Sequence, residues 1–415
     1  MEYGLIGEKL GHSFSKQIHQ QLADYDYELL ALNQEAFKAF MIHKDFKAIN
    51  VTIPYKQAVL PYLDEIDEQA KAIGAVNTIV NDQGRLIGHN SDYLGFIYLL
   101  DKHNIIIEHK KVIILGNGGA AQAVKAACKH LNVGQLLCVK QHLSDETITY
   151  EELYEKHPDA QLIINTSPVG MYPNNQEQVI DLSFFHQCEH VIDIIYNPLR
   201  TTLVQAAIDQ GMDAIGGLEM LVAQGFYAAE FFLNQTLAIQ RIDEIYHQTL
   251  KSKSNIVLIG MPSCGKTTIG KQCAALLNKT FVDTDEEIIK EIHMSIKDYF
   301  EQFGEAAFRK IECNVCERLS KENNLVIATG GGIIKDANNV FHLKQNGLLI
   351  YIKREPNKLL IDPSRPLSKD RQAILTMYHQ RHPSYLKSAH EMIHNDGTLE
   401  DACNQIIKLY ENRQI

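Results

Sequence analysis

Residues 112–124 read VIILGNGGAAQAV, and this stretch decides the fold of the region around it. The apolar run predicts a buried strand, Gly116, Gly118 and Gly119 predict a tight turn, and the alanine-rich segment that follows has helical periodicity. In the form G-x-G-x-x-A, with Ala121 last, the glycines let the backbone approach a pyrophosphate at a helix N-terminus. The stretch therefore predicts a dinucleotide-binding turn, with a purely structural turn as the alternative.

A second phosphate-binding pattern lies at residues 255–270, which read NIVLIGMPSCGKTTIG. The pattern G-x-x-x-x-G-K-[ST] is completed by Gly260, Gly265, Lys266 and Thr267. Backbone N–H groups of such a loop surround phosphates, while Lys266 would reach the β- and γ-phosphates and Thr267 would bind Mg²⁺. The alternative is a loop that binds a nucleotide without transferring a phosphoryl group.

Strand-like and helix-like segments alternate along most of the chain, which predicts an α/β fold with parallel sheets. We expect strands within residues 111–116, 160–167, 190–196, 255–260, 324–332 and 347–353. We expect helices at 120–131 and 266–277, and one long helix from about 217 to 248. The polar segment Tyr246–Asn255 predicts a linker between two domains, and a further boundary is expected between residues 100 and 110.

Length and charge limit the classes of function. The chain has 415 residues, of which 45% are apolar, so two or three globular domains are expected. A net charge of −11 argues against nucleic acid or an anionic membrane as the main partner. The N-terminal residues lack a targeting pattern, and no window is apolar enough to span a membrane, so we expect a soluble cytoplasmic protein.

Short polar side chains are concentrated in the first hundred residues. The set comprises hydroxyls, amides, one ammonium and one carboxylate: Ser13, Ser15, Asn50, Thr52, Lys56, Asn77, Asn90 and Asp92. Such a set suits a small ligand rich in hydroxyl groups, although each member alone is more typical of a helix cap, a turn or a solvated charge. Residues 135–142, QLLCVKQH, place Lys140 and no acid after the next strand, which favours NADP over NAD.

Residues 1 to 249 resemble the shikimate dehydrogenase family. The family's motifs occur in order as HSFSKQIH, NVTIPYK, AVNT, GHNSD, GNGGAAQAV, INTSPVGM, DIIYNP and GGLEMLVAQG. The resemblance implies a substrate lobe, 1–100 plus 220–249, and a Rossmann-type NADP-binding lobe, 101–219. It also implies reduction of 3-dehydroshikimate to shikimate with NADPH.

The resemblance implies a role for each matching residue. Lys56 and Asp92 match the catalytic pair. Positions that hold the substrate are matched by Ser13, Ser15, Thr52, Asn77, Asp92, Tyr196 and Gln224. Positions that hold the cofactor are matched by Gly116, Asn117, Gly118, Gly119, Ala120, Lys140 and Gly217.

Several positions depart from the family pattern. Lys16 stands where the family usually has Pro, Gly225 replaces Ala, and Ser91 and Tyr93 replace Thr and Gly. The family's Asn-Arg-Thr after the strand is absent, so the clamp on the 2′-phosphate rests on Lys140 alone, and Lys lacks the bidentate fork of Arg. An enzyme that acts on quinate with NAD is therefore an alternative for this half.

Residues 254 to 415 resemble shikimate kinase. The motifs after the phosphate loop are FVDTDEEI at 281–288, FGEAAFRKIE at 303–312, ATGGG at 328–332, DPSRPLS at 362–368 and HQRHPSY at 379–385. A glycine triplet at a strand end lets a ligand lie against bare backbone. Arg309 and Glu312 are three residues apart on a helix, where the alternative is a surface pair.

The kinase resemblance implies MgATP-dependent phosphorylation of shikimate to shikimate 3-phosphate. Asp285 would bind the ring hydroxyls and act on the attacking one, and Arg309, Gly332 and Arg381 would hold shikimate. Mg²⁺ would be bound by Thr267 and Asp283. ATP would be bound by Ser263, Cys264, Gly265, Lys266, Thr267, Thr268 and Arg365, of which Lys266 and Arg365 are also catalytic.

Lys358 falls near the position where the family has an adenine-stacking Arg. The two resemblances together predict a bifunctional enzyme that makes shikimate and then consumes it. A protein that retains both folds and has lost turnover is the alternative from another class. The full sets of predicted catalytic side chains argue against it.

Overall fold

The computed structural model describes residues 1–11, 13–140, 147–361 and 370–413. Internal contacts divide the chain into two compact units, Met1–Thr249 and Leu250–Ile415. Arg365, a predicted catalytic residue, lies outside the described residues.

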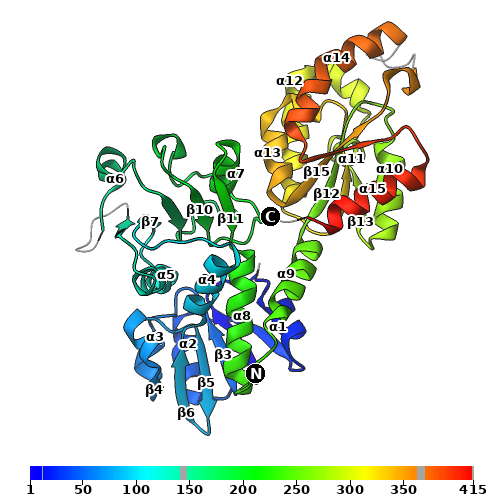
Figure 1. Ribbon diagram of the computed structural model, residues 1–415. Coiled ribbons are helices and arrows are strands. Elements are labelled where there is room, and N and C mark those ends of the chain that lie inside the picture. Colours follow the sequence, from blue (N-terminus) through cyan, green and yellow to red (C-terminus); the bar gives the residue numbers. More distant parts are fainter. Residues whose placement is uncertain (12, 141–146, 362–369, 414–415) are drawn as a thin grey trace. The chain divides into compact units, whose positions relative to one another are not determined.

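The first unit begins with a six-stranded mixed sheet of order β2-β1-β3-β5-β6-β4 (Figure 1). Its strands are β1 Tyr3–Gly7, β2 Tyr27–Ala31, β3 Ala48–Val51, β4 Glu65–Ile66, β5 Thr78–Asp82 and β6 Arg85–His89. Strand β1 is parallel to β2 and β3, whereas β5 is antiparallel to β3 and β6. The connections contain α1 Ser15–Leu22, α2 Gln34–His43, the 3-10 helix η1 Leu60–Tyr62 and α3 Glu68–Ile73.

A five-stranded parallel sheet of order β11-β10-β9-β7-β8 follows in the same unit. Its strands are β7 Lys111–Leu115, β8 Gln135–Val139, β9 Leu162–Asn165, β10 His190–Asp193 and β11 Asp213–Gly216. Its helices are α5 Gly119–His130, α6 Tyr150–Lys156, the 3-10 helix η2 Leu182–Phe184 and α7 Thr202–Asp209. Strand order reverses at β7, which places the glycine turn at the point where open parallel sheets bind ligands.

Helix α8, Leu218–Leu233, returns to the first sheet and packs closely along α4, Ser91–Lys102 (Figure 1). A β-carbon at Gly95 of α4 would lie 2.9 Å from the carbonyl oxygen of Met220 and 3.0 Å from Cβ of Gln224. Only glycine permits this approach without a shift of backbone. The close packing brings Gln224 to the first turn of α4, beside residues that are more than a hundred positions earlier in the chain.

The single long helix predicted from 217 to 248 is wrong. Helix α8 ends at Leu233, and α9 begins at Gln240 and runs to Lys253. Asn234 ends α8 with φ of +50°, a left-handed conformation that Asn adopts more readily than most residues. The predicted polar linker is also largely helical, because α9 continues through its lysines and contains the boundary between the two units.

The second unit is built on a parallel sheet of order β13-β14-β12-β15-β16. Its strands are β12 Asn255–Ile259, β13 Thr280–Asp283, β14 Leu325–Ala328, β15 Gly347–Lys353 and β16 Glu391–His394. Its helices are α10 Lys266–Leu276, α11 Thr284–Ile292, α12 Ile296–Ser320, α13 Ala337–Asn346, α14 Arg371–Ser388 and α15 Leu399–Glu411. Two 3-10 helices are η3 Ile333–Lys335 and η4 Pro356–Lys358.

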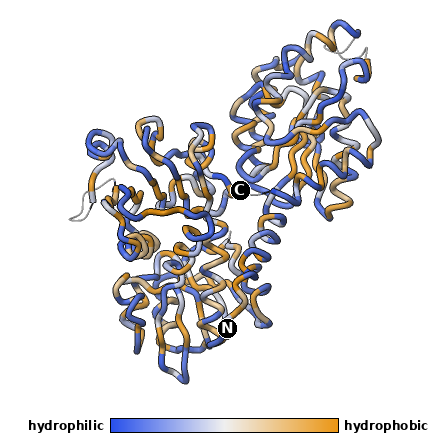
Figure 2. Tube along the Cα trace, in the orientation of Figure 1, coloured by the Kyte–Doolittle hydropathy of each residue, from blue (hydrophilic) through white to orange (hydrophobic). Residues whose placement is uncertain are grey.

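The central strands of both parallel sheets are buried on both faces, as their apolar runs predict. Every residue of β12 is buried, and so are Val112 to Leu115 of β7. Figure 2 shows these strands near the hydrophobic end of the scale. The expected strands and the helices at 120–131 and 266–277 are confirmed, and with them the α/β fold of a two-lobed Rossmann-type unit and a phosphate-loop unit.

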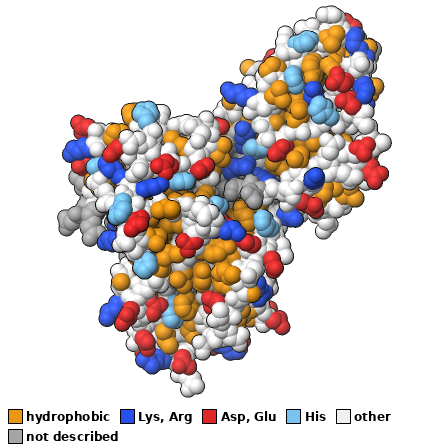
Figure 3. All heavy atoms as spheres, viewed as in Figure 1, with side chains coloured by type: hydrophobic (Ala, Val, Ile, Leu, Met, Phe, Trp, Pro, Cys, Tyr) orange, Lys and Arg blue, Asp and Glu red, His pale blue; other side chains and the backbone are white. Residues whose placement is uncertain are grey.

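Among the described residues, no helix is both long and apolar enough to cross a bilayer. On the face that Figure 3 shows, basic and acidic side chains are interspersed rather than sorted by sign. Any anionic ligand of this acidic chain therefore depends on local cations and backbone N–H groups.

Candidate active sites

Lys56 and Asp92 form an ion pair at the carboxyl edge of the first sheet. Lys56 lies in the turn after β3, and Asp92 lies in the first turn of α4, whose N-cap Asn90 accepts a hydrogen bond from the N–H of Tyr93. Lys56 Nζ is 2.5 Å from Asp92 Oδ2, and the two side chains are 14% and 9% exposed. An ammonium held this way is oriented and shielded, which excludes the alternative of a freely solvated charge.

A network of amides and hydroxyls lies beside this pair. Asn77 Oδ1 accepts hydrogen bonds from the N–H (2.7 Å) and the hydroxyl (3.2 Å) of Ser91. The Ser91 hydroxyl also lies 3.3 Å from Gln224 Oε1, so its single hydrogen has two acceptors within reach, one on Asn77 and one on Gln224. Behind them Asn50, which is buried, donates to the carbonyl of Asn77 and accepts from the hydroxyl of Tyr27 at 2.7 Å.

Sequence reasoning assigned no role to Ser91 and treated it only as a departure from a motif. Its position next to Asp92 on the first turn of α4 was the available signal. Thr52 lies on the same edge, between β3 and Lys56. Asn77 and Gln224 therefore meet at Ser91, the neighbour of Asp92, which pairs with Lys56. That these residues hold a small polyhydroxyl ligand stays a prediction.

A second group of predicted residues joins the two sheets of this unit. Ser13 Oγ accepts the N–H of Ser15, and the ring of the intervening Phe14 lies 5.1 Å from that of Tyr196, which follows β10. Burial raises the pKa of Tyr196, and a hydrogen bond with Ser13 opposes this rise. Ser13, Ser15 and Tyr196 therefore form a neutral, hydrogen-bonding wall.

The glycine turn begins where β7 ends. Gly116 has φ of +107°, and a β-carbon there would lie 3.0 Å from Thr166 Oγ1. Gly118 caps α5 without a side chain, so the N–H groups of Gly119 and Ala120 begin the helix without a capping acceptor. Such N–H groups form a ready site for a phosphate.

The turn also comes close to the pair of Lys56 and Asp92. A β-carbon at Gly119 would lie 3.2 Å from Cβ and 3.3 Å from Cδ of Lys56. Gly217 is equally constrained, because a β-carbon there would overlap the carbonyl of Ile194. Lys140 is exposed at the carboxyl end of β8, and its ammonium makes no ion pair with the described residues. Gln141 and His142, the next two residues of the chain, lie outside the described residues.

The phosphate loop of the second unit joins β12 to α10. Gly260, Ser263 and Gly265 have φ of +150°, +63° and +103°. Lys266 Nζ donates to the carbonyls of Gly260 and Met261, both at 2.9 Å. Cys264 is buried, and its carbonyl accepts a hydrogen bond of 2.7 Å from Asn395 Nδ2. No pattern in the sequence indicates that Asn395 contacts the phosphate loop.

Hydroxyl and carboxylate groups meet next to the loop. Thr267 Oγ1 donates to Asp283 Oδ2 at 3.0 Å, while Thr268 is exposed in the same turn of α10. Asp283 is the N-cap of α11, and its Oδ1 accepts a hydrogen bond from the N–H of Asp285. Asp285 faces Gly330, where a β-carbon would lie 2.6 Å from its Oδ1. The glycine is required for this carboxylate to approach the backbone.

The glycine triplet is surrounded by arginines. A β-carbon at Gly332 would lie 3.0 Å from both terminal nitrogens of Arg309, and Arg381 donates to the carbonyl of Gly331 at 2.8 Å. Arg309 also donates to Glu312 at 2.6 Å, and Glu312 is only 2% exposed. Burial raises the pKa of Glu312, which Arg309 opposes. The alternative of a surface pair is therefore wrong.

Both units are similar to known protein families. The model described as "Shikimate dehydrogenase substrate binding domain" matches residues 5–79, and the one described as "Shikimate kinase" matches residues 262–411. The NADP(+) shikimate dehydrogenase of Clostridium beijerinckii is 38% identical over 252 residues, which are 55% of this chain and 91% of that protein. The chain belongs to the shikimate dehydrogenase family. Its C-terminal part carries a shikimate kinase domain.

Solved structures agree with this assignment for the first unit. Shikimate dehydrogenase 1 of Peptoclostridium difficile is 33% identical, with a TM-score of 0.56 over 60% of this chain and 97% of that one. A Thermus thermophilus shikimate 5-dehydrogenase in complex with NADP(H) and shikimate is 25% identical, with a TM-score of 0.54 over 60% and 99%. The chain thus combines an NADP-type oxidoreductase with a transferase of the shikimate pathway.

Lys358 of the kinase domain, expected near the adenine, lies in η4 and pairs with Asp396 at 3.3 Å.

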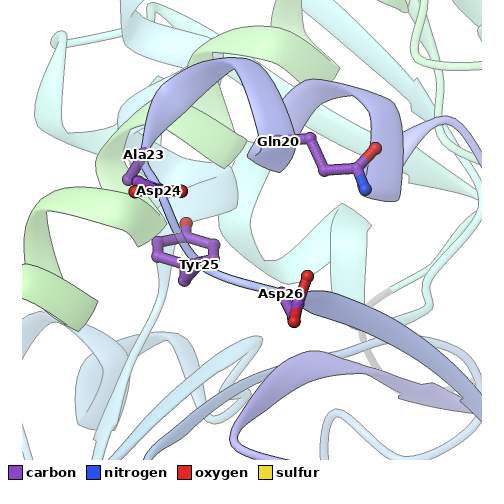
Figure 4. A pocket seen from close by; sticks show the side chains of 5 residues that line it. All are labelled: Gln20, Ala23, Asp24, Tyr25 and Asp26. Atoms are coloured by element: carbon purple, nitrogen blue, oxygen red, sulfur yellow. The ribbon is translucent and has the colours of Figure 1, made fainter.

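A cavity of about 340 Å³ lies in the dehydrogenase unit at the end of α1, as Figure 4 shows. It is lined by Gln20, Ala23, Asp24, Tyr25 and Asp26. None of these is a predicted site residue.

Sequence reasoning also missed a buried carboxyl group in the dehydrogenase unit. Asp193, at the end of β10, accepts hydrogen bonds from Thr201 Oγ1 (2.6 Å), Asn165 Nδ2 (3.1 Å) and the N–H of Ile195 (3.1 Å). Asn165 Oδ1 then accepts from the N–H and hydroxyl of Ser167. Burial raises the pKa of Asp193 to about 7, against the opposing effect of these donors.

This pKa predicts a pH-dependent stability of the dehydrogenase unit. Between pH 4 and 7 folded Asp193 keeps a proton that the unfolded chain has lost, so its stabilising contribution falls as pH rises through this window. From pH 5 to 8 the parent should lose on the order of 2 kcal/mol relative to Asp193→Asn. Thermal unfolding of both proteins across this range measures the difference, and parallel curves would contradict it.

Proposed function

We propose that the chain catalyses two consecutive reactions. The dehydrogenase unit reduces 3-dehydroshikimate to shikimate with NADPH, in lobes that we place at 1–100 plus 220–249 and at 101–219. The kinase domain, 254–415, then phosphorylates shikimate to shikimate 3-phosphate with MgATP. The observation that carries the proposal is the close approach of Gly119, in the dinucleotide turn, to the stem of Lys56, whose ammonium is paired with Asp92.

In the first reaction, NADPH supplies a hydride to the ring ketone when it is bound. The ketone oxygen then needs a proton, and Lys56 is the shielded cation at this edge that can donate it. Asp92 orients the ammonium. Gln224, Asn77 and the Ser13–Tyr196 wall would hold the ring hydroxyls and the carboxylate with hydrogen bonds.

In the second reaction, positioning and neutralisation of charge do most of the work. Thr267 and Asp283 would hold Mg²⁺, since hydroxyl and carboxylate oxygens 3.0 Å apart suit a hard cation. Mg²⁺ neutralises charge on the β- and γ-phosphates when it is bound. Lys266 would leave the loop carbonyls for those phosphates, and Asp285 would act on the attacking hydroxyl.

The shikimate carboxylate would lie between Arg309 and Arg381, close to Gly332. Both guanidinium groups border the glycine triplet at the end of β14, where bare backbone leaves room for a ring. Arg365 remains a proposed contact to the transferring phosphate.

Replacement of Lys56 by Ala tests the proton donor. We expect dehydrogenase turnover to fall by roughly 10²–10⁴, the usual contribution of a positioned acid, with a smaller effect on the binding of 3-dehydroshikimate. Lys47→Ala, which removes an exposed lysine paired with Glu2, is the matched control. Turnover of Lys56→Ala within threefold of the parent would remove Lys56 from the mechanism.

Replacement of Lys140 by Ala tests the cofactor. Because only NADPH carries the 2′-phosphate, the KM for NADPH should rise while that for NADH stays nearly constant. Lys129→Ala, at the exposed end of α5, should change neither value. Equal effects on both cofactors would reject this clamp and favour an enzyme that uses NAD.

Replacement of Lys266 by Ala tests the independence of the two activities. Shikimate phosphorylation should fall at least about 10²-fold, since charge stabilisation is lost at the transferring phosphate. Reduction of 3-dehydroshikimate should stay near the parental rate, and Lys271→Ala on the same helix should affect neither reaction. Circular dichroism would check folding, and a joint loss of both activities in a folded variant would contradict two independent sites.

A further inference from the structure

The carbonyl oxygen of Gly331, the middle residue of the glycine triplet, accepts two hydrogen bonds from helix α14. Arg381 Nη1 donates to it at 2.8 Å, and the hydroxyl of Tyr385 donates at 2.6 Å. The two donors are four residues apart on α14, so they lie on the same face of the helix. A carbonyl oxygen has two lone pairs, and these two donors use both.

Tyr385 is the more firmly held of the two donors. Its side chain is 0% exposed, and its ring stacks on that of Tyr351 of β15, with the ring centroids 5.0 Å apart. Arg381 is only partly buried. Burial raises the pKa of Tyr385, and Arg381 opposes this rise through its charge and a hydrogen bond. Because a guanidinium group can only donate, the one hydrogen of the Tyr385 hydroxyl is available to the carbonyl of Gly331.

Gly331 lies between α14 and the phosphate loop. A β-carbon at Gly331 would lie 2.8 Å from Cδ of Pro262, so this glycine packs closely against the loop. The glycines on either side of it approach Asp285 and Arg309. The carbonyl that receives both bonds from α14 is therefore in the middle of the proposed substrate site.

The two hydrogen bonds determine how freely Arg381 can move. Its bond to the carbonyl is charge-assisted, and turning the guanidinium group toward a ligand removes one donor from Gly331. With Tyr385 present, the carbonyl keeps a hydrogen bond after that movement. Without the Tyr385 hydroxyl, the carbonyl would keep no donor among the described residues, and this loss would oppose the movement of Arg381.

We propose that Tyr385 is a positioning residue of the kinase site. Its hydroxyl keeps the carbonyl of Gly331 hydrogen-bonded, so that Arg381 can turn toward the carboxylate of shikimate. The inference rests on the proposed binding of that carboxylate by Arg381. Tyr385 ends the matched stretch HQRHPSY, which assigns it no role.

The decisive variant is Tyr385→Phe, which keeps the ring and its stacking and removes the hydroxyl. The KM for shikimate should rise by about five- to thirtyfold, as for a carbonyl that loses its donor when the ligand binds. At saturating shikimate, kcat should stay within about twofold of the parental value, because only binding is weakened. The KM for MgATP should not change, because Tyr385 acts on Arg381 and not on the nucleotide.

Tyr351→Phe is the matched control. Tyr351 is as fully buried as Tyr385, and its hydroxyl lies 3.0 Å from Nδ1 of His382 rather than at the glycine triplet. This variant should lower the unfolding temperature about as much as Tyr385→Phe does and leave the KM for shikimate at the parental value. A similar rise of this KM in both variants would assign the effect to core packing and overturn the inference.

A second test removes Arg381. In the background of Arg381→Met, the replacement Tyr385→Phe should change the KM for shikimate by less than about twofold, because Tyr385 acts through Arg381. Two effects that multiply in the double variant would mean that Tyr385 acts independently of Arg381. That result would overturn the assignment.

Initial rates of ADP formation by the full chain, with shikimate and MgATP varied in turn, measure these constants, and circular dichroism measures the unfolding temperatures. If Tyr385→Phe keeps a KM within about twofold of a parent that phosphorylates shikimate, the inference is overturned while the proposed function stands. A fall of kcat with a rise of both KM values, or a variant that does not fold, would make Tyr385 a residue of the fold alone and would also overturn it. A parent that forms no ADP from shikimate would refute both.

Discussion

Both halves of this chain depend on one constraint. After a buried parallel strand the chain must turn sharply, and the next helix then begins with N–H groups that no side chain caps. Gly116 and Gly260 adopt positive φ at the ends of β7 and β12, and Gly265 does so again before α10. Residues with a β-carbon rarely adopt these angles, and at Gly116 and Gly260 a β-carbon would also crowd the backbone of a neighbouring strand end. Bare N–H groups at the start of a helix favour a phosphate, and in an acidic chain they supply positive potential without a further cation.

The glycine turn of the dehydrogenase unit lies close to the pair of Lys56 and Asp92. Gly119 leaves no room for a β-carbon beside the stem of Lys56, and Lys56 pairs with Asp92 at the start of α4. Ser91, in the first turn of α4, is hydrogen-bonded to Gln224 of α8. The close packing of α8 against Gly95 of α4 keeps Gln224 at this position. One packed assembly therefore positions both the dinucleotide turn and Lys56, the proposed proton donor. In the kinase domain, Gly330 and Gly332 have the corresponding role, because their lack of side chains admits Asp285 and Arg309.

Much of this could be predicted from the sequence, and the exceptions have physical reasons. Apolar runs bounded by glycines defined the strands, and motif order defined both families. The helix break at Asn234 was missed because helical periodicity continues across it, and only a left-handed angle at one residue ends α8. A surface pair of Arg309 and Glu312 stayed open as an alternative because spacing on a helix does not report burial. The clusters around Asp193, Gly331 and Asn395 join residues from different elements or turns, so no short pattern predicts them.

The central claim is that one polypeptide makes shikimate and consumes it. The most direct measurement supplies the purified chain with 3-dehydroshikimate, NADPH and MgATP and follows loss of NADPH and formation of ADP in the same sample. The account predicts that both occur, that ADP forms only when NADPH is present, and that shikimate 3-phosphate accumulates. Oxidation of NADPH without formation of ADP, even after shikimate is added directly, would contradict it.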